Sequence, residues 1–288
     1  MQPTIAIIAR VGAHRPFEVL GLEAGETEVR ETPYGPSRPI HLFQHRELDF
    51  AVLSRHGESG YEISAPFINS RANLYALKDL GVEKILAWAA PGSLKEDLAP
   101  GDLVVPHDVL DEGRHAPQTF FAGAGWGFIR HNPLFCPNLR QALIAGLAGA
   151  SFTCHTQAVY SATTGPRLET AAEIRKLRLL GGDLVGQTLV PEVFLARELE
   201  LCYVALTYVV NYAEGLMDRP YQPGVLFEGL ATAAEMARVA RVERAFPELL
   251  LQLLPALAAA PRDCPCPRLM ERYRQRGDIS ADWRTWVR

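Results

Sequence analysis

Residues 4–12 read TIAIIARVG, an apolar run that ends in an arginine, a valine and a glycine. A short run of this kind predicts a strand that is buried on both faces of a parallel sheet. The loop after the first strand of such a sheet often holds a phosphate, because its backbone N–H groups converge on the anion. Phosphate loops usually carry several glycines and a hydroxyl residue, whereas this one has Arg10, Val11 and Gly12. The stretch predicts the first strand of an α/β sheet and leaves open whether its loop binds an anion.

Apolar runs alternate with helical patterns along the rest of the chain, which is typical of an α/β domain with a buried sheet. We predict one domain with a central mixed β-sheet flanked by helices over residues 1–260. A C-terminal tail over 261–288 is expected to pack on the domain or on a neighbouring subunit. The Gly- and Trp-rich stretch 120–133 predicts a long loop, a feature that is often functional. The expected strands are 5–9, 50–54, 84–89, 102–106, 158–162, 184–187 and 202–210, and the expected helices are 70–81, 169–182, 191–200 and 225–257.

The composition favours a soluble protein that acts on small molecules. Of 288 residues 48% are hydrophobic, and the formal net charge of -4 argues against a nucleic-acid or membrane surface. No apolar stretch is long enough to cross a membrane, and the chain begins in a strand without a charged leader. We therefore expect a cytoplasmic protein that holds any bound anion with a local cluster of donors.

The five cysteines predict neither a disulfide scaffold nor a metal site, because their number is odd and their spacing contains no pair of ligand pairs. The sequence CPC at 264–266 admits two interpretations: two thiols in a Pro-rich turn, or a redox-active or stapling pair. The first is favoured.

Four groups of candidate site residues follow predicted strands, where open α/β sheets place their ligands. Arg55 and His56 offer donors for an oxyanion, although exposed Arg-His pairs are usually only solvated. The stretch AWAAPGSL at 87–94 allows close backbone approach to a ligand, or it forms a tight turn with a serine cap. Glu169 precedes a helix and is either a cap or an acceptor for a planar heterocycle. The last group is Thr188 with Asn211, whose amide is either a turn residue or a match for a carbonyl beside a ring nitrogen.

The order of these motifs resembles one family. The motifs occur in this order along the chain: RHG at 55–57, NSRANLYALKDLG at 69–81, PGSL with PGDLVVP, GPRLET at 165–170 and TLVPE at 188–192. PQTFFAG and LFCPNLR lie between them. The chain to about residue 250 thereby resembles the trimeric purine nucleoside phosphorylases and methylthioadenosine phosphorylases. The CPC motif is also similar to a Cys-x-Cys of some members.

The resemblance implies a nucleoside phosphorylase-like domain that cleaves the N-glycosidic bond of a purine nucleoside with phosphate, giving free base and ribose 1-phosphate. It implies a homotrimer or a dimer of trimers, with phosphate as co-substrate and no metal or organic cofactor. The implied catalytic residues are Asn211, Glu169 and His56. The implied phosphate-binding residues are Arg55, His56, Ala90 through its amide, Thr188 and Arg10, and the implied substrate-binding residues are Gln187, Glu169, Asn211, Leu168 and His131, the last in a neighbouring subunit's 5′ pocket.

The resemblance also implies which base is recognised. Members that act on 6-aminopurines carry an aspartate at the position of Asn211 and a second one at the position of Ala213. Members that act on 6-oxopurines pair a glutamate in the ET motif with an asparagine, as this chain does with Glu169 and Asn211. The asparagine amide donates to O6 and accepts from a ring N–H, and Glu169 accepts from N1–H. Hydrogen-bonding sites discriminate strongly between such patterns. We therefore expect inosine, guanosine or methylthioinosine as the nucleoside.

The first loop departs from the family pattern. Val11 stands where the family has a hydroxyl residue that binds phosphate, and Ala89 stands where it often has a polar side chain. Hydrogen bonds to a charged group contribute roughly 1.5–3 kcal/mol each, so the two losses weaken phosphate binding unless Arg10 replaces them. Two alternatives stay open beside phosphorolysis: a nucleosidase that uses water or another acceptor, and a non-catalytic nucleoside-binding trimer.

Overall fold

β1 (Ile5–Ala9) lies near the centre of the larger of two sheets in the computed structural model, which describes residues 1–113, 118–221, 223–226 and 230–287. It pairs in parallel with β6 and with β7, and β7 pairs in parallel with β14. Antiparallel strands at both sides make the sheet mixed. In spatial order its strands are β11 (Cys154–His155), β9 (Leu103–Val104), β14 (Cys202–Tyr208), β7 (Lys84–Ala89), β1, β6 (Leu48–Ser54), β5 (Ile40–His45) and β2 (Ala24–Glu28).

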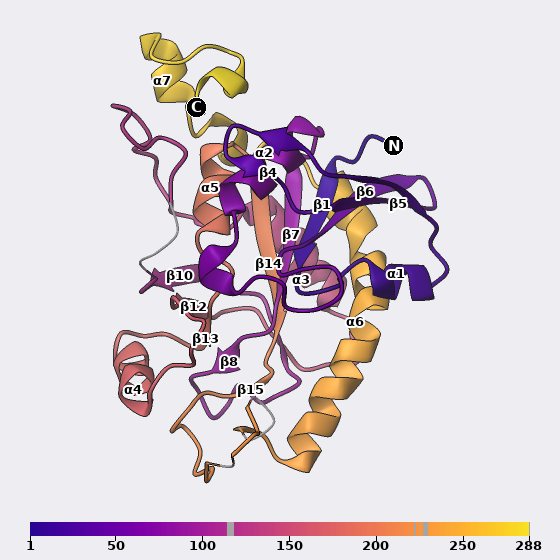
Figure 1. The fold of residues 1–288 in the computed structure, drawn as a ribbon, viewed down its shortest axis with the longest axis vertical. Helices are drawn as coiled ribbons and strands as arrows, with labels where there is room; N and C mark the ends of the chain where they lie inside the picture. Colours follow the sequence, from indigo (N-terminus) through magenta and orange to yellow (C-terminus); the bar gives the residue numbers. More distant parts are fainter. Residues whose placement is uncertain (114–117, 222, 227–229, 288) are drawn as a thin grey trace.

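The second sheet continues from two strands of the first. After β7 the chain enters β8 (Gly92–Ser93), and after β14 it enters β15 (Asn211–Tyr212), which pairs in parallel with β8. The junction between the sheets therefore lies at the carboxyl ends of β7 and β14, below the centre of Figure 1. The remaining strands of the second sheet are β10 (Asp108–Asp111), β12 (Val159–Ala162) and β13 (Leu184–Gly186), and β3 (Glu31–Thr32) with β4 (Gly35–Pro36) forms a separate ribbon.

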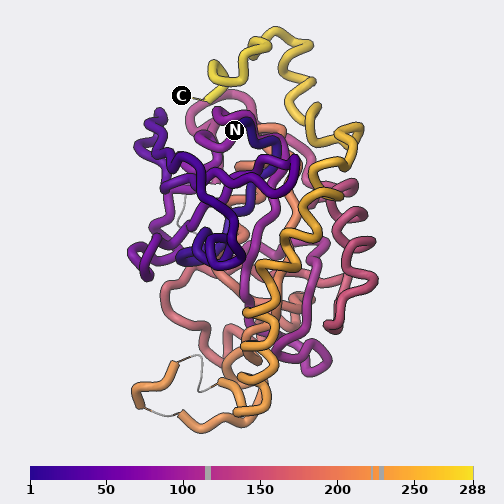
Figure 2. The backbone as a smooth tube through the Cα atoms, turned by 90° about the vertical axis from the view of Figure 1, so that its right-hand side faces the viewer, coloured from indigo at the N-terminus to yellow at the C-terminus, as the bar shows by residue number. Residues whose placement is uncertain are grey.

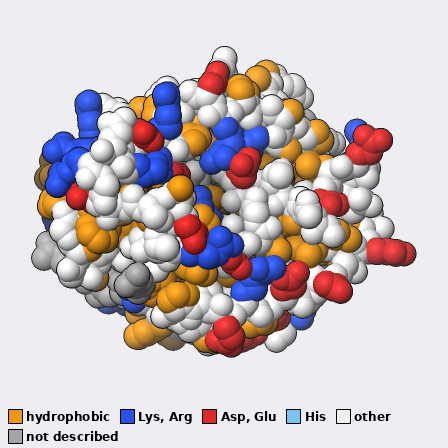
Figure 3. All heavy atoms as spheres, turned by 90° about the horizontal axis from the view of Figure 1, so that it is seen from above, with side chains coloured by type: hydrophobic (Ala, Val, Ile, Leu, Met, Phe, Trp, Pro, Cys, Tyr) orange, Lys and Arg blue, Asp and Glu red, His pale blue; other side chains and the backbone are white. Residues whose placement is uncertain are grey.

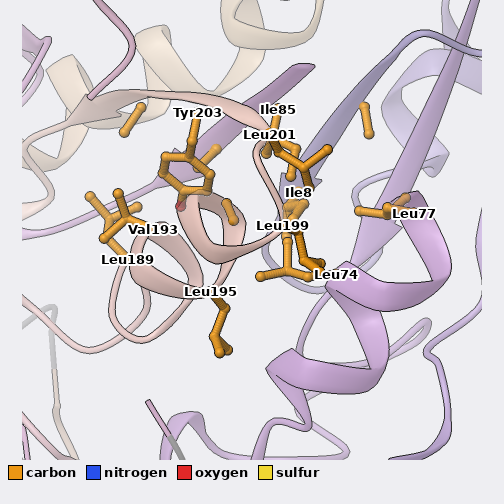
Figure 4. Close-up of a cluster of buried hydrophobic side chains, with 14 of the residues drawn as sticks. Ile8, Leu74, Leu77, Ile85, Leu189, Val193, Leu195, Leu199, Leu201 and Tyr203 are labelled. Atoms are coloured by element: carbon orange, nitrogen blue, oxygen red, sulfur yellow. The ribbon is translucent and has the colours of Figure 1, made fainter. Parts of the chain in front are cut away.

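Alternating side chains of β1 pack into two hydrophobic cores, because successive residues of a strand point to opposite faces of a sheet. Ala6 and Ile8 belong to a core with α2 (Ser70–Asp79) and α5 (Glu192–Glu198). Figure 4 shows leucines of α2 and side chains from the α5 region gathered around Ile8. Ile5 and Ile7 belong to the core on the opposite face. The uninterrupted apolar run of β1 is thus explained by burial on both faces.

Three helices cover the second face of the larger sheet: α1 (Arg15–Val19), α3 (Pro137–Leu147) and α6 (Ala233–Ala259). Figure 2 shows α6 running along much of the molecule, with α3 packed beside it. Its N-terminus is capped by Thr232 and Glu235, each of which bonds the other's backbone N–H. α4 (Ala171–Leu179) lies beside the second sheet, and α7 (Glu271–Arg276) lies in the tail (Figure 1). Among the described residues, no helix combines the length and apolar character that crossing a membrane requires.

The predicted elements agree with the structure except at their ends and in the elements that the prediction omitted. All seven predicted strands and all four predicted helices are present, and β1 and β7 have the predicted bounds. The helix expected over 225–257 begins only at Ala233, after a stretch that includes residues outside the described part. Residues 120–133 lack regular structure, as predicted, but they do not line the cavity described below. The prediction omitted three helices, α1, α3 and α7, and the strands β2, β3, β4, β5, β8, β10, β11 and β15, most of which are short.

Phe246 is the residue of α6 whose truncation is expected to cost most. It is fully buried and stacks on Trp88 at the end of β7, with ring centroids 4.6 Å apart. The variant Phe246→Ala leaves a cavity there and is expected to lower the free energy of unfolding by about 3–5 kcal/mol. Urea unfolding measures it, with Arg244→Ala on the exposed side of the same helix as control. Equal effects of the two variants would contradict this packing.

Candidate active site

A cavity of about 730 Å³ lies at the junction between the two sheets. Its lining includes residues at or just after the ends of β1, β6, β7, β13 and β14, together with residues of β15 and α6. Ligands of open α/β sheets bind at the carboxyl ends of the strands, and this volume is typical of a site for a small molecule. The cavity is therefore the candidate active site.

The cavity brings together most of the residues that the sequence predicted for the site. The predicted residues in its wall are Arg10, Arg55, His56, Ala90, Leu168, Glu169, Gln187, Thr188 and Asn211. His131 is not among them. Its ring lies against Phe194 and its Nδ1 accepts a hydrogen bond from Arg197 Nε at 3.1 Å. Within one chain, His131 is thus separate from the site.

Arg55 is fixed by a buried ion pair. Its side chain is 1% exposed, and its Nε and Nη2 donate to the two carboxylate oxygens of Glu192 at 2.6 and 3.0 Å. Two carbonyl oxygens, of Ile8 and Trp88, accept from Nη2 and Nη1. Burial opposes the charged form, but the Glu192 carboxylate outweighs it and raises the pKa of Arg55. Because a guanidinium has five N–H groups, these four bonds leave one on Nη1 for a ligand.

His56 is a neutral acceptor rather than a cation. Burial and the adjacent charge of Arg55 lower its pKa to about 4. Its Nδ1 lies 3.0 Å from the carbonyl oxygen of Ile63. Since a carbonyl can only accept, Nδ1 carries the proton of the neutral ring, and Nε2 is left with a lone pair. A ligand at Nε2 must then donate a hydrogen bond.

Arg10 is paired with residues of the cavity wall although its side chain is partly exposed. Its Nη1 donates to Glu243 Oε1 at 2.6 Å and to the Tyr208 hydroxyl at 3.1 Å, and that hydroxyl donates to the same Oε1 at 2.7 Å. The guanidinium also lies 5.7 Å from the centre of the Trp88 ring. Its side chain stays 46% exposed. Arg10 therefore contributes donors to the cavity, but Glu243 neutralises its charge.

Asn211 presents an unpaired amide to the cavity. The residue is 4% exposed, and among the described residues no group forms a hydrogen bond with its side-chain amide. Buried polar groups are nearly always paired, so this amide is arranged for a ligand. Gly92 makes room for it, because a Cβ at that position would lie 2.9 Å from Asn211 Oδ1.

Glu169 lies in the cavity wall but does not cap the following helix. Of the two interpretations that the sequence left open, the cap is excluded, because the cap of α4 is Thr170, in a capping box with Glu173. Glu169 Oε1 instead accepts hydrogen bonds from the Thr163 hydroxyl and, at 3.4 Å, from Gln187 Nε2. These contacts hold the carboxylate of Glu169 against the cavity.

Several wall residues were missed by the sequence reasoning. Tyr208 is the last residue of β14 and Trp88 is the last but one of β7, and both strands were predicted. Their positions next to predicted site residues could therefore have indicated them. Glu243 and its neighbours on α6 gave no signal, because only tertiary packing brings this helix to the strand ends. The apolar wall residues added by the structure include Leu226, Leu230, Met236 and Val239.

Groups of side chains able to ligate a metal lie outside this cavity. Among the described residues there are two: His14, His41 and Glu58, and a second group formed by four of the five cysteines. The cysteine spacing gave no ligand pattern, yet the fold brings Cys136, Cys202, Cys264 and Cys266 together.

A mixed α/β fold with a cavity at its strand ends is typical of enzymes that act on small molecules, and comparisons with known proteins narrow the class. The Phosphorylase superfamily matches residues 4–253. The probable 6-oxopurine nucleoside phosphorylase of Thermococcus kodakarensis is 36% identical over 92% of this chain and 96% of its own. The probable S-methyl-5'-thioinosine phosphorylase of Methanopyrus kandleri is 38% identical over 87% and 94%. A methylthioadenosine phosphorylase structure from an antarctic soil metagenomic library superimposes with a TM-score of 0.83, at 28% identity over 99% and 97%.

The chain belongs to the Phosphorylase superfamily. This membership confirms the family resemblance, the α/β fold class and the prediction of an enzyme. The roles assigned to individual residues stay predictions.

The lowered pKa of His56 predicts a pH dependence of stability. Its pKa is about 4 in the folded protein against 6.5 in an unfolded chain, so the unfolded chain takes up the proton first as pH falls. The neutral ring's contribution is complete above 6.5 and is lost toward pH 4, a loss on the order of 3 kcal/mol. Urea unfolding across this range should show a shallower pH slope for His56→Gln than for the wild type. Identical slopes would contradict a neutral buried His56.

Proposed function

We propose that this enzyme cleaves the N-glycosidic bond of 6-oxopurine nucleosides with phosphate and releases the free base and a ribose 1-phosphate. One observation carries the proposal: a single cavity is lined by the Asn211 amide, which has no hydrogen-bond partner among the described residues, by the Glu169 carboxylate, and by arginine and hydroxyl donors. The amide and the carboxylate suit a purine edge, and the arginine and hydroxyl donors suit an oxyanion. The names of the relatives in the same superfamily support this substrate class.

Base recognition rests on Asn211 and Glu169. The amide of Asn211 donates to O6 and accepts from a ring N–H, and Glu169 accepts from N1–H. Adenine reverses the donor pattern at this edge, which leaves buried groups unpaired and disfavours its binding. As the glycosidic bond breaks, negative charge develops on the purine, so the donor at O6 stabilises the transition state more than the ground state.

The proposed phosphate site holds few charged groups that lack a partner. Arg55 offers one N–H, Thr188 a hydroxyl and Ala90 a backbone amide. Neutral His56 accepts at Nε2 and therefore favours a phosphate that carries a proton. The bound phosphate faces the sugar, whose carbon becomes cationic as the base departs, and then forms the new C–O bond.

The apolar part of the wall suits a sugar with an apolar 5′ substituent. Leu226, Leu230, Met236 and Val239 supply this surface. Each methylene group buried on binding contributes about 0.8 kcal/mol to the binding free energy. A 5′-methylthio group therefore gains affinity from this surface, whereas a 5′-hydroxyl does not. Methylthioinosine is accordingly proposed as a substrate beside inosine and guanosine.

The wider properties implied by the family resemblance are part of this proposal. They are a homotrimer or dimer of trimers, a cytoplasmic location, and phosphate as co-substrate without a metal or organic cofactor in the reaction. His131 lies outside the cavity of its own chain and is proposed to face the 5′ pocket of a neighbouring subunit.

 

One assay tests the proposal. The enzyme is incubated with inosine or methylthioinosine, with and without phosphate, and hypoxanthine release is followed. Release that depends strictly on phosphate is the expected result. Release without phosphate would favour a nucleosidase, and binding without turnover would favour a non-catalytic protein; either would overturn the proposal.

A second prediction concerns Arg10. Replacing Glu243 with glutamine removes the charge that neutralises Arg10 and frees its guanidinium for phosphate. A charge-assisted hydrogen bond contributes roughly 1.5–3 kcal/mol, so Glu243→Gln is expected to lower the KM for phosphate about tenfold. Glu248→Gln, at an exposed position of the same helix, is the control. An unchanged or higher KM for phosphate in Glu243→Gln would show that Arg10 takes no part in phosphate binding.

A further inference from the structure

Four cysteines from three distant segments meet in the core. Cys136 is the N-cap residue of α3, Cys202 is the first residue of β14, and Cys264 and Cys266 lie in the C-terminal tail. All four are buried free thiols. Their Sγ atoms lie within 4.8 Å of one another, and that of Cys264 is 3.6 Å from Cys136 and 3.5 Å from Cys202.

These separations fit four sulfur ligands around one ion. Zn–S bonds of about 2.3 Å in a tetrahedron place the sulfur atoms about 3.8 Å apart. The set supplies four soft ligands and no oxygen or nitrogen, which favours zinc over hard cations such as magnesium or calcium. A complete set of four buried thiolates is typical of a closed structural site rather than of a catalytic one.

A buried cation beside the cluster supplies an independent argument. Arg197 is 3% exposed and lies next to the Cys266 side chain. Its other contacts are neutral: the carbonyl oxygens of Leu134 and Arg130 and the ring of His131. Among the described residues no carboxylate pairs with it. Buried charges are normally paired, so the environment of Arg197 calls for a negative group at the cluster.

We propose that Cys136, Cys202, Cys264 and Cys266 bind a structural Zn²⁺ ion that fastens the C-terminal tail to the domain. Each thiol releases its proton to solvent and forms one Zn–S bond, with no change of oxidation state. The resulting centre carries two negative charges, which Arg197 partly balances. Zinc thereby joins the start of α3, the start of β14 and the tail.

The position of this site explains how the tail holds its place. Beyond the cysteines, the tail contributes Met270, Tyr273 and Trp286 to the core around α2 and α5. Arg274 makes a bidentate ion pair with the buried Glu200, and the pair of Arg284 with Asp79 lies nearer the surface, where it contributes little. Figure 3 looks onto the end of the molecule that carries α7 and shows basic side chains beside acidic ones. A metal centre provides the stronger attachment.

The experiment measures metal and thiols in the full chain. Protein purified under reducing conditions from zinc-supplemented medium is expected to contain about one zinc per chain by mass spectrometry. Cys266→Ser is expected to lose most of this zinc and to melt at a lower temperature. Cys154→Ser is the matched control, because Cys154 lies outside the cluster. Glycosidic cleavage is not needed for this readout, so the result is independent of the proposed function.

A second measurement covers the case in which Cys266→Ser does not fold. Cobalt added to metal-stripped wild-type protein is expected to give thiolate-to-cobalt charge transfer and the intense visible absorption of a tetrahedral site. Three results would overturn the proposal: five free thiols with no zinc or cobalt bound, iron in place of zinc, or disulfide bonds among the four cysteines in freshly purified protein.

Discussion

The buried ion pair of Arg55 and Glu192 is the interaction on which the geometry of the site depends. Arg55 follows β6, yet its guanidinium bonds the carbonyls of Ile8 in β1 and Trp88 in β7. Glu192 belongs to α5 and also accepts a hydrogen bond from the hydroxyl of Tyr203 in β14. One ion pair thus links four neighbouring strands and a helix behind the cavity. Loss of one partner leaves an uncompensated buried charge, which typically costs about 3–5 kcal/mol.

This arrangement shapes the electrostatics of the cavity. Most N–H groups of Arg55 are hydrogen-bonded to Glu192 and to strand carbonyls, and the charge of Arg10 is neutralised by Glu243. Neither arginine presents an unpaired charge, and neutral His56 adds none. In the proposed phosphate site, affinity depends on how far Arg10 can exchange Glu243 for the anion. The proposed base site differs, because the amide of Asn211 has no partner among the described residues to give up before it binds.

The sequence predicted the parts of the fold that depend on local patterns. β1 and β7 were predictable to the residue because both are buried on two faces and read as continuous apolar runs. The strand ends also located Arg55, His56 and Asn211 correctly at one cavity. The role of Glu243 and the meeting of the cysteines were not predictable, since each joins segments far apart in the chain. The sequence left open whether Glu169 caps α4, and the structure excludes this because Thr170 with Glu173 forms the cap.

The central claim is that Asn211 and Glu169 select a 6-oxopurine. The most direct measurement compares kcat/KM for inosine and adenosine in the wild type and in the double variant Asn211→Asp with Ala213→Asp. Sites built on hydrogen bonds reject a mismatched partner strongly, so the wild type should prefer inosine by on the order of a thousandfold or more. The double variant should narrow or reverse this preference. Equal cleavage of inosine and adenosine by the wild type would contradict the account.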